Sequence, residues 1–206
     1  MKISLTNCGK RFNREWIFRK FSYNFSSGQT YAITGPNGSG KSTLLQVIAG
    51  ALVTSEGNIT YQNGNAAEVS PDHAFRYLSI AAPYLEVVEE MTLTEFLKFH
   101  QQFKPFLPGT DVDKAIARVG LASSAHKQIR YYSSGMKQRV KLIQAILSDV
   151  SCVLLDEPCT NLDAEGIGMY QQLIAEYQGS RTIIVSSNDL QEYGFCEHNI
   201  RIMDYK

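Results

Sequence analysis

The sequence lacks several features that mark particular classes of protein. Its 4 cysteines include no C-x-x-C pair, which argues against a zinc site or a redox motif. The 20 Lys and Arg balance the 20 Asp and Glu, so no net charge draws the chain to nucleic acid. No stretch approaches the roughly 20 apolar residues that span a bilayer, and Met1 to Ser4 has no apolar signal-peptide core. These absences predict a soluble cytoplasmic protein with free thiols, no structural metal and no nucleic-acid partner.

One glycine-rich stretch has the spacing G-x-x-x-x-G-K-[ST] of a phosphate-binding loop. The apolar residues 31–34 before it are typical of a buried strand, and residues 44–49 after it of a helix. Glycines let the backbone wrap an anion, so that N–H groups and the helix N-terminus point at phosphate oxygens. We therefore predict that the loop binds a nucleoside triphosphate, with Lys41 on the β- and γ-phosphates and the Ser42 hydroxyl on Mg²⁺. The loop residues are Gly35, Pro36, Asn37, Gly38, Ser39, Gly40, Lys41, Ser42 and Thr43.

The remaining patterns predict a single α/β domain over residues 1–206. Strand-like alternation near the start, with a turn at Asn13, predicts a small antiparallel layer beside a parallel core. In the middle third, Thr92 or Thr94 is the expected cap of a helix. The expected elements are strands over residues 3–25, 31–34, 57–61, 151–155 and 182–185, helices over 44–49, 164–177 and 189–193, and a mainly helical region over 91–150.

Two acids follow the buried strand at residues 151–155. A carboxylate at the carboxyl end of a parallel strand faces the crevice in which α/β sheets hold ligands. Beside a phosphate loop, Asp156 is expected to hold Mg²⁺, and Glu157 to orient or deprotonate the attacking water. The alternative is that the two acids only cap a helix.

Between these motifs lies the peptide Ser-Ser-Gly-Met-Lys-Gln-Arg, residues 133–139. Ser133 or Ser134 is placed to cap a long helix, whose N-terminus can receive an anion. From the residues alone, a plain capping turn is the simplest interpretation.

The order of the motifs resembles the nucleotide-binding subunits of ATP-binding cassette (ABC) transporters. The resemblance rests on the phosphate loop, the peptide at 133–139, Val-Leu-Leu-Asp-Glu-Pro at 153–158 and Thr-Asn-Leu-Asp at 160–163. It extends over nearly the whole chain. It implies a RecA-like P-loop NTPase core with an antiparallel β-subdomain and a helical subdomain at about residues 84–150.

The resemblance also implies a nucleotide site shared by two chains. ATP would lie between the phosphate loop of one subunit and the signature peptide of another, so that Ser133, Ser134 and Gly135 contact a neighbour's nucleotide. Asp163 would face across the resulting homodimer or heterodimer. An aromatic side chain stacks on adenine in this family, and Phe12 lies at the matching place, with Trp16 as the alternative; either can instead pack the core of the β-arm.

The chain departs from the family pattern at two positions. The family Gln that contacts Mg²⁺ and water would fall within residues 80–83, which contain no Gln. Asn188 stands where a switch His contacts the γ-phosphate, and an Asn amide can donate a hydrogen bond but cannot become cationic. We expect activity to persist with Asn188 partly replacing the His, but hydrolysis to be slow.

The resemblance implies an ATPase subunit that powers a separate integral membrane permease from the cytoplasmic face of the cell membrane. The apolar residues among acids at 84–91 suit docking to that permease, although the segment can equally pack on its own core. Two alternatives stay open: a non-transport ABC ATPase without a permease, and a catalytically weak partner of an active homologue.

Overall fold

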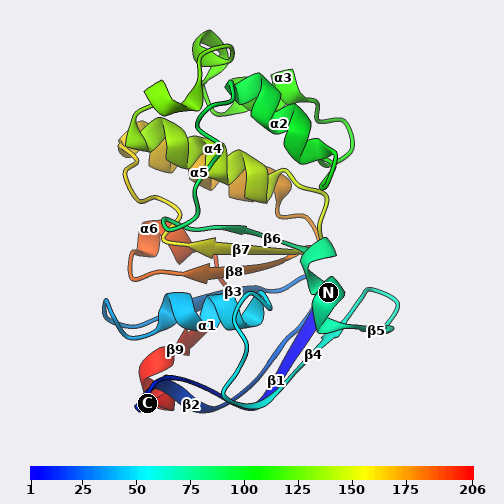
Figure 1. The fold of residues 1–206 in the computed structure, drawn as a ribbon, viewed down its shortest axis with the longest axis vertical. Helices are drawn as coiled ribbons and strands as arrows, with labels where there is room; N and C mark the ends of the chain where they lie inside the picture. Colours follow the sequence, from blue (N-terminus) through cyan, green and yellow to red (C-terminus); the bar gives the residue numbers. More distant parts are fainter.

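The computed structural model describes all 206 residues as two sheets and a group of helices (Figure 1). The strands are β1 (Lys2–Phe12), β2 (Glu15–Phe25), β3 (Thr30–Thr34), β4 (Glu56–Gln62), β5 (Glu68–Val69), β6 (Leu78–Ala81), β7 (Cys152–Asp156), β8 (Thr182–Ser186) and β9 (His198–Arg201). The helices are α1 (Lys41–Ile48), α2 (Leu93–Gln101), α3 (Val112–Arg118), α4 (Ser134–Ile146), α5 (Ala164–Tyr177) and α6 (Leu190–Tyr193). Short 3-10 turns lie at Pro71–Arg76, Ala122–Ser124, Ile129–Tyr131 and Ile202–Tyr205.

The amino-terminal part forms the predicted antiparallel sheet, in the order β2-β1-β4-β5. β1 and β2 are joined by the expected turn at Asn13, whose φ of 53° lies in the left-handed region. Asparagine tolerates that conformation because its short side chain bonds to nearby backbone.

The second sheet has the order β6-β7-β8-β3-β9 and is parallel throughout. β3 lies between β8 and β9, so a strand from the first quarter of the chain pairs with two from the last quarter. The carboxyl ends of β3, β7 and β8 therefore meet at one edge of the sheet, where α/β proteins bind ligands.

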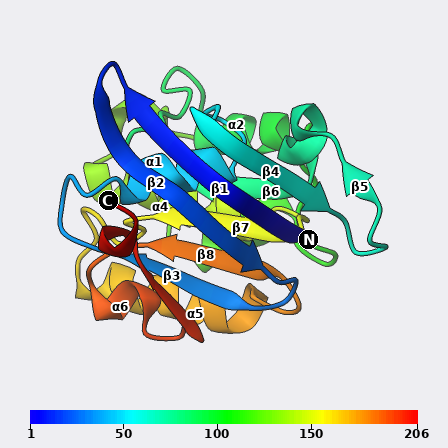
Figure 2. The same cartoon turned by 90° about the horizontal axis from the view of Figure 1, so that it is seen from below.

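Successive residues of the central strands point into two different cores. Val153 and Leu155 of β7 pack with α4 and α5, whereas Leu154 packs with α1 on the other face. Helix α1 is enclosed between the two sheets, which explains why its Leu44 and Leu45 are buried (Figures 1 and 2). A sheet covered on both faces accounts for the continuous apolar runs of β7 and β8.

The chain between β6 and β7 contains α2, α3 and α4, which lie on the side of the parallel sheet away from β1 and β2 (Figure 1). Thr92, rather than Thr94, caps α2, and its hydroxyl accepts the Glu95 N–H while the Glu95 carboxylate accepts the Thr92 N–H. The structure contains no helix that is both long and apolar enough to cross a membrane.

Candidate nucleotide-binding site

The phosphate loop joins β3 to α1, as the sequence predicts. Helix α1 has no side-chain cap, so its N-terminal N–H groups stay available to an anion. Gly40 is at φ 98°, and a Cβ built there would lie 2.4 Å from the Cγ2 atom of Ile17 in β2. Only glycine fits this position, because any side chain would collide with β2 and strain the backbone.

Lys41 is buried at the first position of α1, with only 4% of its surface exposed. Its ammonium donates to the carbonyl oxygen of Gly35 at 2.8 Å and to that of Pro36 at 3.4 Å. The cation therefore lies inside the curve of the loop, where its backbone partners hold it ready for exchange with phosphate oxygens.

Asp156 ends β7 and is 1% exposed. Its Oδ1 atom has no hydrogen-bond partner. Burial raises the pKa of the Asp156 carboxyl above its ordinary value, and the nearby Ser42 and Ser186 hydroxyls oppose that shift. An orphaned carboxylate oxygen beside the Ser42 hydroxyl offers the hard oxygen ligands that Mg²⁺ prefers, so these residues fit the ion.

Glu157 lines the same cavity as the phosphate loop, a space of about 210 Å³ bordered by residues 37–43 and by Ile17. The Glu157 backbone has φ 42°, an uncommon conformation for a residue with a side chain, and its N–H donates to the Ser186 carbonyl oxygen at 2.9 Å. The carboxylate is thus held at the mouth of the loop by the turn that follows β7.

Asn188 follows β8 and contacts the phosphate loop directly. Its Oδ1 atom accepts the Gly35 N–H at 3.0 Å, and its Nδ2 atom lies 3.5 Å from Oδ1 of Asn37. The structure therefore brings together the loop, Glu157 and Asn188 from three separate regions of the sequence.

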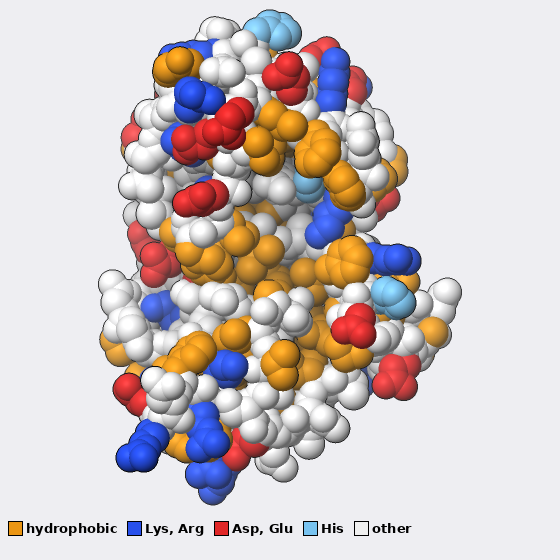
Figure 3. Space-filling model, in the orientation of Figure 1, with side chains coloured by type: hydrophobic (Ala, Val, Ile, Leu, Met, Phe, Trp, Pro, Cys, Tyr) orange, Lys and Arg blue, Asp and Glu red, His pale blue; other side chains and the backbone are white.

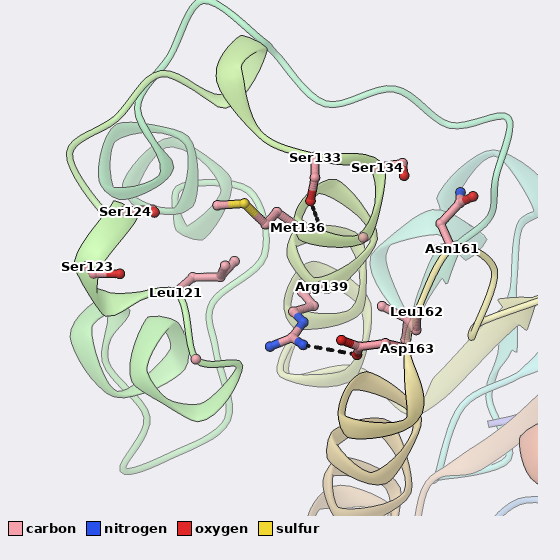
Figure 4. A pocket seen from close by; sticks show the side chains of 12 residues that line it. Leu121, Ser123, Ser124, Ser133, Ser134, Met136, Arg139, Asn161, Leu162 and Asp163 are labelled. Atoms are coloured by element: carbon pink, nitrogen blue, oxygen red, sulfur yellow. Dashed lines mark hydrogen bonds and ion pairs between the residues drawn. The ribbon is translucent and has the colours of Figure 1, made fainter.

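The serine-rich peptide borders a different cavity, of about 480 Å³, shown in Figure 4. Ser133 caps α4 by accepting the Met136 N–H at 3.2 Å, and its own O–H remains free to donate. The cavity shares no lining residue with the one at the phosphate loop. Its lining is Gly120, Leu121, Ser123, Ser124, Ser133, Ser134, Gly135, Met136, Arg139, Asn161, Leu162 and Asp163.

Two contacts in this second cavity join α4 to the segment after β7. A Cβ on Gly135 would lie 2.8 Å from the carbonyl oxygen of Asn161, so the close approach requires glycine. Asp163 caps α5 by accepting the Gly166 N–H at 2.8 Å, and it also lies 3.5 Å from the Arg139 guanidinium (Figure 4).

The two aromatic candidates for adenine stacking differ in their surroundings. Trp16 packs under the Arg19 guanidinium, 4.3 Å from its ring centroid, and Arg19 also pairs with Glu56. Phe12 is 48% exposed, with only the Lys10 ammonium over its ring at 5.2 Å. Phe12 therefore has the freer ring face, and its stacking role stays a prediction.

The structure adds two site neighbours that sequence patterns did not indicate. Ile17 borders the phosphate-loop cavity from β2. Burial, and to a smaller extent the negative charge of Asp156, raise the pKa of the Tyr84 phenol to about 12. Sequence patterns could not predict these two neighbours, because neither residue belongs to the segments that carry the phosphate loop and the two acids.

A family model described as ABC transporter matches residues 18–160. The chain belongs to the ABC transporter family. This result confirms that it is a nucleotide-binding subunit of that family, as the order of the motifs predicts.

Relatives in the ABC transporter family align over most of this chain. The cytochrome c biogenesis ATP-binding export protein CcmA of Agrobacterium fabrum is 32% identical over 191 residues, or 91% of this chain and 88% of the relative. An uncharacterized ABC transporter ATP-binding protein of Bacillus subtilis is 29% identical over 192 residues, covering 92% of this chain and 87% of the relative.

Solved structures confirm the ABC fold. A putative ABC transporter ATP-binding protein from Pyrococcus furiosus superposes with a TM-score of 0.83 at 21% identity, covering 100% of both chains. A dimeric ATP-binding cassette bound to ADP and phosphate gives a TM-score of 0.81 at 21% identity, covering 97% of this chain and 94% of that one.

Proposed function

We propose that the chain binds and hydrolyses ATP, and that ATP-driven pairing of two such chains powers a separate membrane permease. The observation that carries this proposal is the division of the motifs between two cavities. The phosphate loop and Glu157 border one cavity, and Ser133 and Gly135 border the other. Two copies of such a chain can complete two sites across a two-fold axis.

In the proposed reaction, the loop N–H groups and Lys41 bind the phosphates and orient the terminal one. The Glu157 carboxylate aligns the attacking water and takes its proton. Asp156 and the Ser42 hydroxyl would hold Mg²⁺, which supplies positive charge to the phosphate oxygens when it is bound. From a neighbouring chain, the free Ser133 O–H would donate to the terminal phosphate.

The concentration dependence of steady-state Mg-ATP hydrolysis tests this function. Turnover per chain should rise with protein concentration, because a productive site needs residues from two chains. Constant turnover per chain down to dilute protein would contradict the shared site. ATP binding without turnover at any concentration would instead favour the catalytically weak partner of an active homologue.

The contact between Asn188 and the phosphate loop supports a role in hydrolysis. Its amide is close enough to the loop to donate to a terminal phosphate, so Asn188→Ala should lower kcat by about 10²-fold, the usual effect of losing one positioned donor. Single-turnover hydrolysis of bound ATP measures the effect without product release. Unchanged turnover in the variant would contradict the proposal that Asn188 partly replaces the switch His.

The surface beside residues 84–91 supports docking to a permease. Figure 3 shows hydrophobic side chains gathered across the waist of this face, between the helices above and the sheets below. A cavity of about 190 Å³ opens there between β6, α2 and α4, and Leu85 and Glu86 border it. Val87 is buried and packs the segment against the core. Val88 is 42% exposed and presents apolar surface to solvent.

The double substitution Leu85→Asp and Val88→Asp should abolish co-purification with the permease while leaving ATP binding unchanged. Two carboxylates in an apolar contact cannot be desolvated without a partner charge. Val53→Asp, which also changes an exposed apolar side chain, is the matched control. A complex retained by the double variant would refute the docking assignment.

The proposed system is of the export class and acts on the inner face of the cell membrane. The relative of Agrobacterium fabrum is named as an export protein, which supports this direction of transport. In such systems the membrane subunit selects the substrate.

A further inference from the structure

Glu192 is a buried carboxylate that borders neither cavity of the nucleotide site. It lies in α6, the short helix after Asn188, and is 5% exposed. Acidic side chains are rarely this buried unless they are paired, yet no cation forms an ion pair with it. The burial of this carboxylate without a cation therefore needs a physical explanation.

The carboxylate holds the turn that carries Glu157. Oε1 of Glu192 accepts the N–H of Cys159 at 2.7 Å, two residues beyond Glu157. This turn contains two residues with left-handed backbones, Glu157 at φ 42° and Asn161 at φ 65°. Such conformations persist only where surrounding contacts fix them, and the Glu192 carboxylate supplies one of these contacts from outside the turn.

Glu192 itself belongs to the segment that carries Asn188, because α6 begins directly after its cap, Asp189. The Glu192 N–H donates to the Asp189 carbonyl oxygen at 2.9 Å, and the Ser187 hydroxyl accepts the Asp189 N–H at 2.9 Å. Burial raises the pKa of Glu192, and the negative charges of Asp189 and Glu157 add to the rise. Glu192 thus keeps a carboxyl group in an environment that disfavours its charge, at the junction of two loops.

We propose that Glu192 is a positioning residue for ATP hydrolysis, because its carboxyl group fixes the turn of Glu157 and the segment of Asn188 relative to each other. The inference rests on the proposed ATPase function. Glu192 touches neither nucleotide nor water in this role. Glu192 acts through the backbone on Glu157 and Asn188, which contact water and nucleotide in the proposed reaction. Loss of Glu192 should therefore slow the chemical step and leave binding at the phosphate loop intact.

The test compares Glu192→Ala with Glu192→Gln. Removing the acceptor should lower kcat by about 10²-fold, the scale of a misplacement of roughly 1 Å, while the Kd for ATP changes less than about threefold. The Gln side chain keeps an oxygen that accepts the Cys159 N–H, so this variant should stay within about threefold of wild-type kcat. Both quantities are measured on the full chain in Mg-ATP.

Tyr170→Phe serves as the stability control. The Tyr170 hydroxyl donates to the backbone carbonyl of Glu192 at 2.7 Å, so this variant removes one buried hydrogen bond to the same residue and keeps the carboxyl contact with Cys159. Its Tm should fall with kcat unchanged. The inference is overturned if Glu192→Ala keeps wild-type kcat, if it loses activity only in proportion to its unfolded fraction, or if Glu192→Gln is as slow as Glu192→Ala.

These failures are distinct from failure of the proposed function. A wild-type chain that turns over ATP while Glu192→Ala turns over equally fast overturns the role of Glu192 alone. A wild-type chain that binds ATP without turnover overturns both, because no hydrolysis then remains to be positioned.

Discussion

Replacing Glu157 with Gln should reduce steady-state ATP hydrolysis by about 10³-fold while leaving ATP binding close to wild type. Glutamine keeps the shape of the side chain at the mouth of the phosphate loop but cannot take a proton from water. The phosphate contacts of the loop are untouched. We therefore expect the variant to accumulate as an ATP-bound pair of chains, detectable as a shift in mass by size-exclusion chromatography with light scattering.

The control is Glu68→Gln, which makes the same chemical change at an exposed position in β5. It should hydrolyse ATP at the wild-type rate. Residual turnover in Glu157→Gln above about a tenth of wild type would show that another group activates the water, and the assignment of Glu157 would then be wrong.

Lys41→Ala should weaken ATP binding by about 10²-fold and remove measurable turnover. The Lys41 ammonium is the only cation that borders the phosphate-loop cavity, so its loss leaves phosphate charge without a buried counter-charge. Fluorescence titration with a labelled ATP analogue measures binding, and phosphate release measures turnover.

Lys98→Ala, at an exposed position in α2, removes one positive charge elsewhere and should change neither quantity. The Lys41 ammonium also bonds to two carbonyl groups of its own loop, so the melting temperature of each variant belongs in the comparison. Wild-type affinity in a folded Lys41→Ala variant would refute the role of this residue.

Features encoded by neighbouring residues were predictable from the sequence. The phosphate loop, the acids at the end of β7 and the cap of α4 at Ser133 each depend on a few consecutive positions. In each case local chemistry decides the structure, because glycine permits the loop and a hydroxyl satisfies a free helix N–H.

The edge strands of the parallel sheet were not predicted. β6 and β9 are each 4 residues long and contain polar side chains. An edge strand pairs on one side only, so its sequence need not show the continuous apolar run of a central strand. Their pairing is decided by the neighbouring strand and not by their own pattern.

The sequence patterns also did not predict contacts between distant segments. Ile17 packs at Gly40 from another sheet, and Glu192 binds the N–H of a residue 33 positions earlier. No periodicity links such pairs, since their proximity follows from the order of strands in the sheet. The two cavities could be inferred only from the family resemblance, because the motifs alone do not say which of them share a site.

The position of β3 between β8 and β9 has a consequence for how the protein matures during synthesis. The phosphate loop leaves the ribosome well before β8 and β9, the two strands that flank β3. Bringing together the ends of a chain segment of that length is slow. Until β8 and β9 pair with β3, the phosphate loop has no sheet edge on which to form. We therefore expect nucleotide binding to be acquired late in folding, so that ATP does not stabilise the early intermediates of newly made chains.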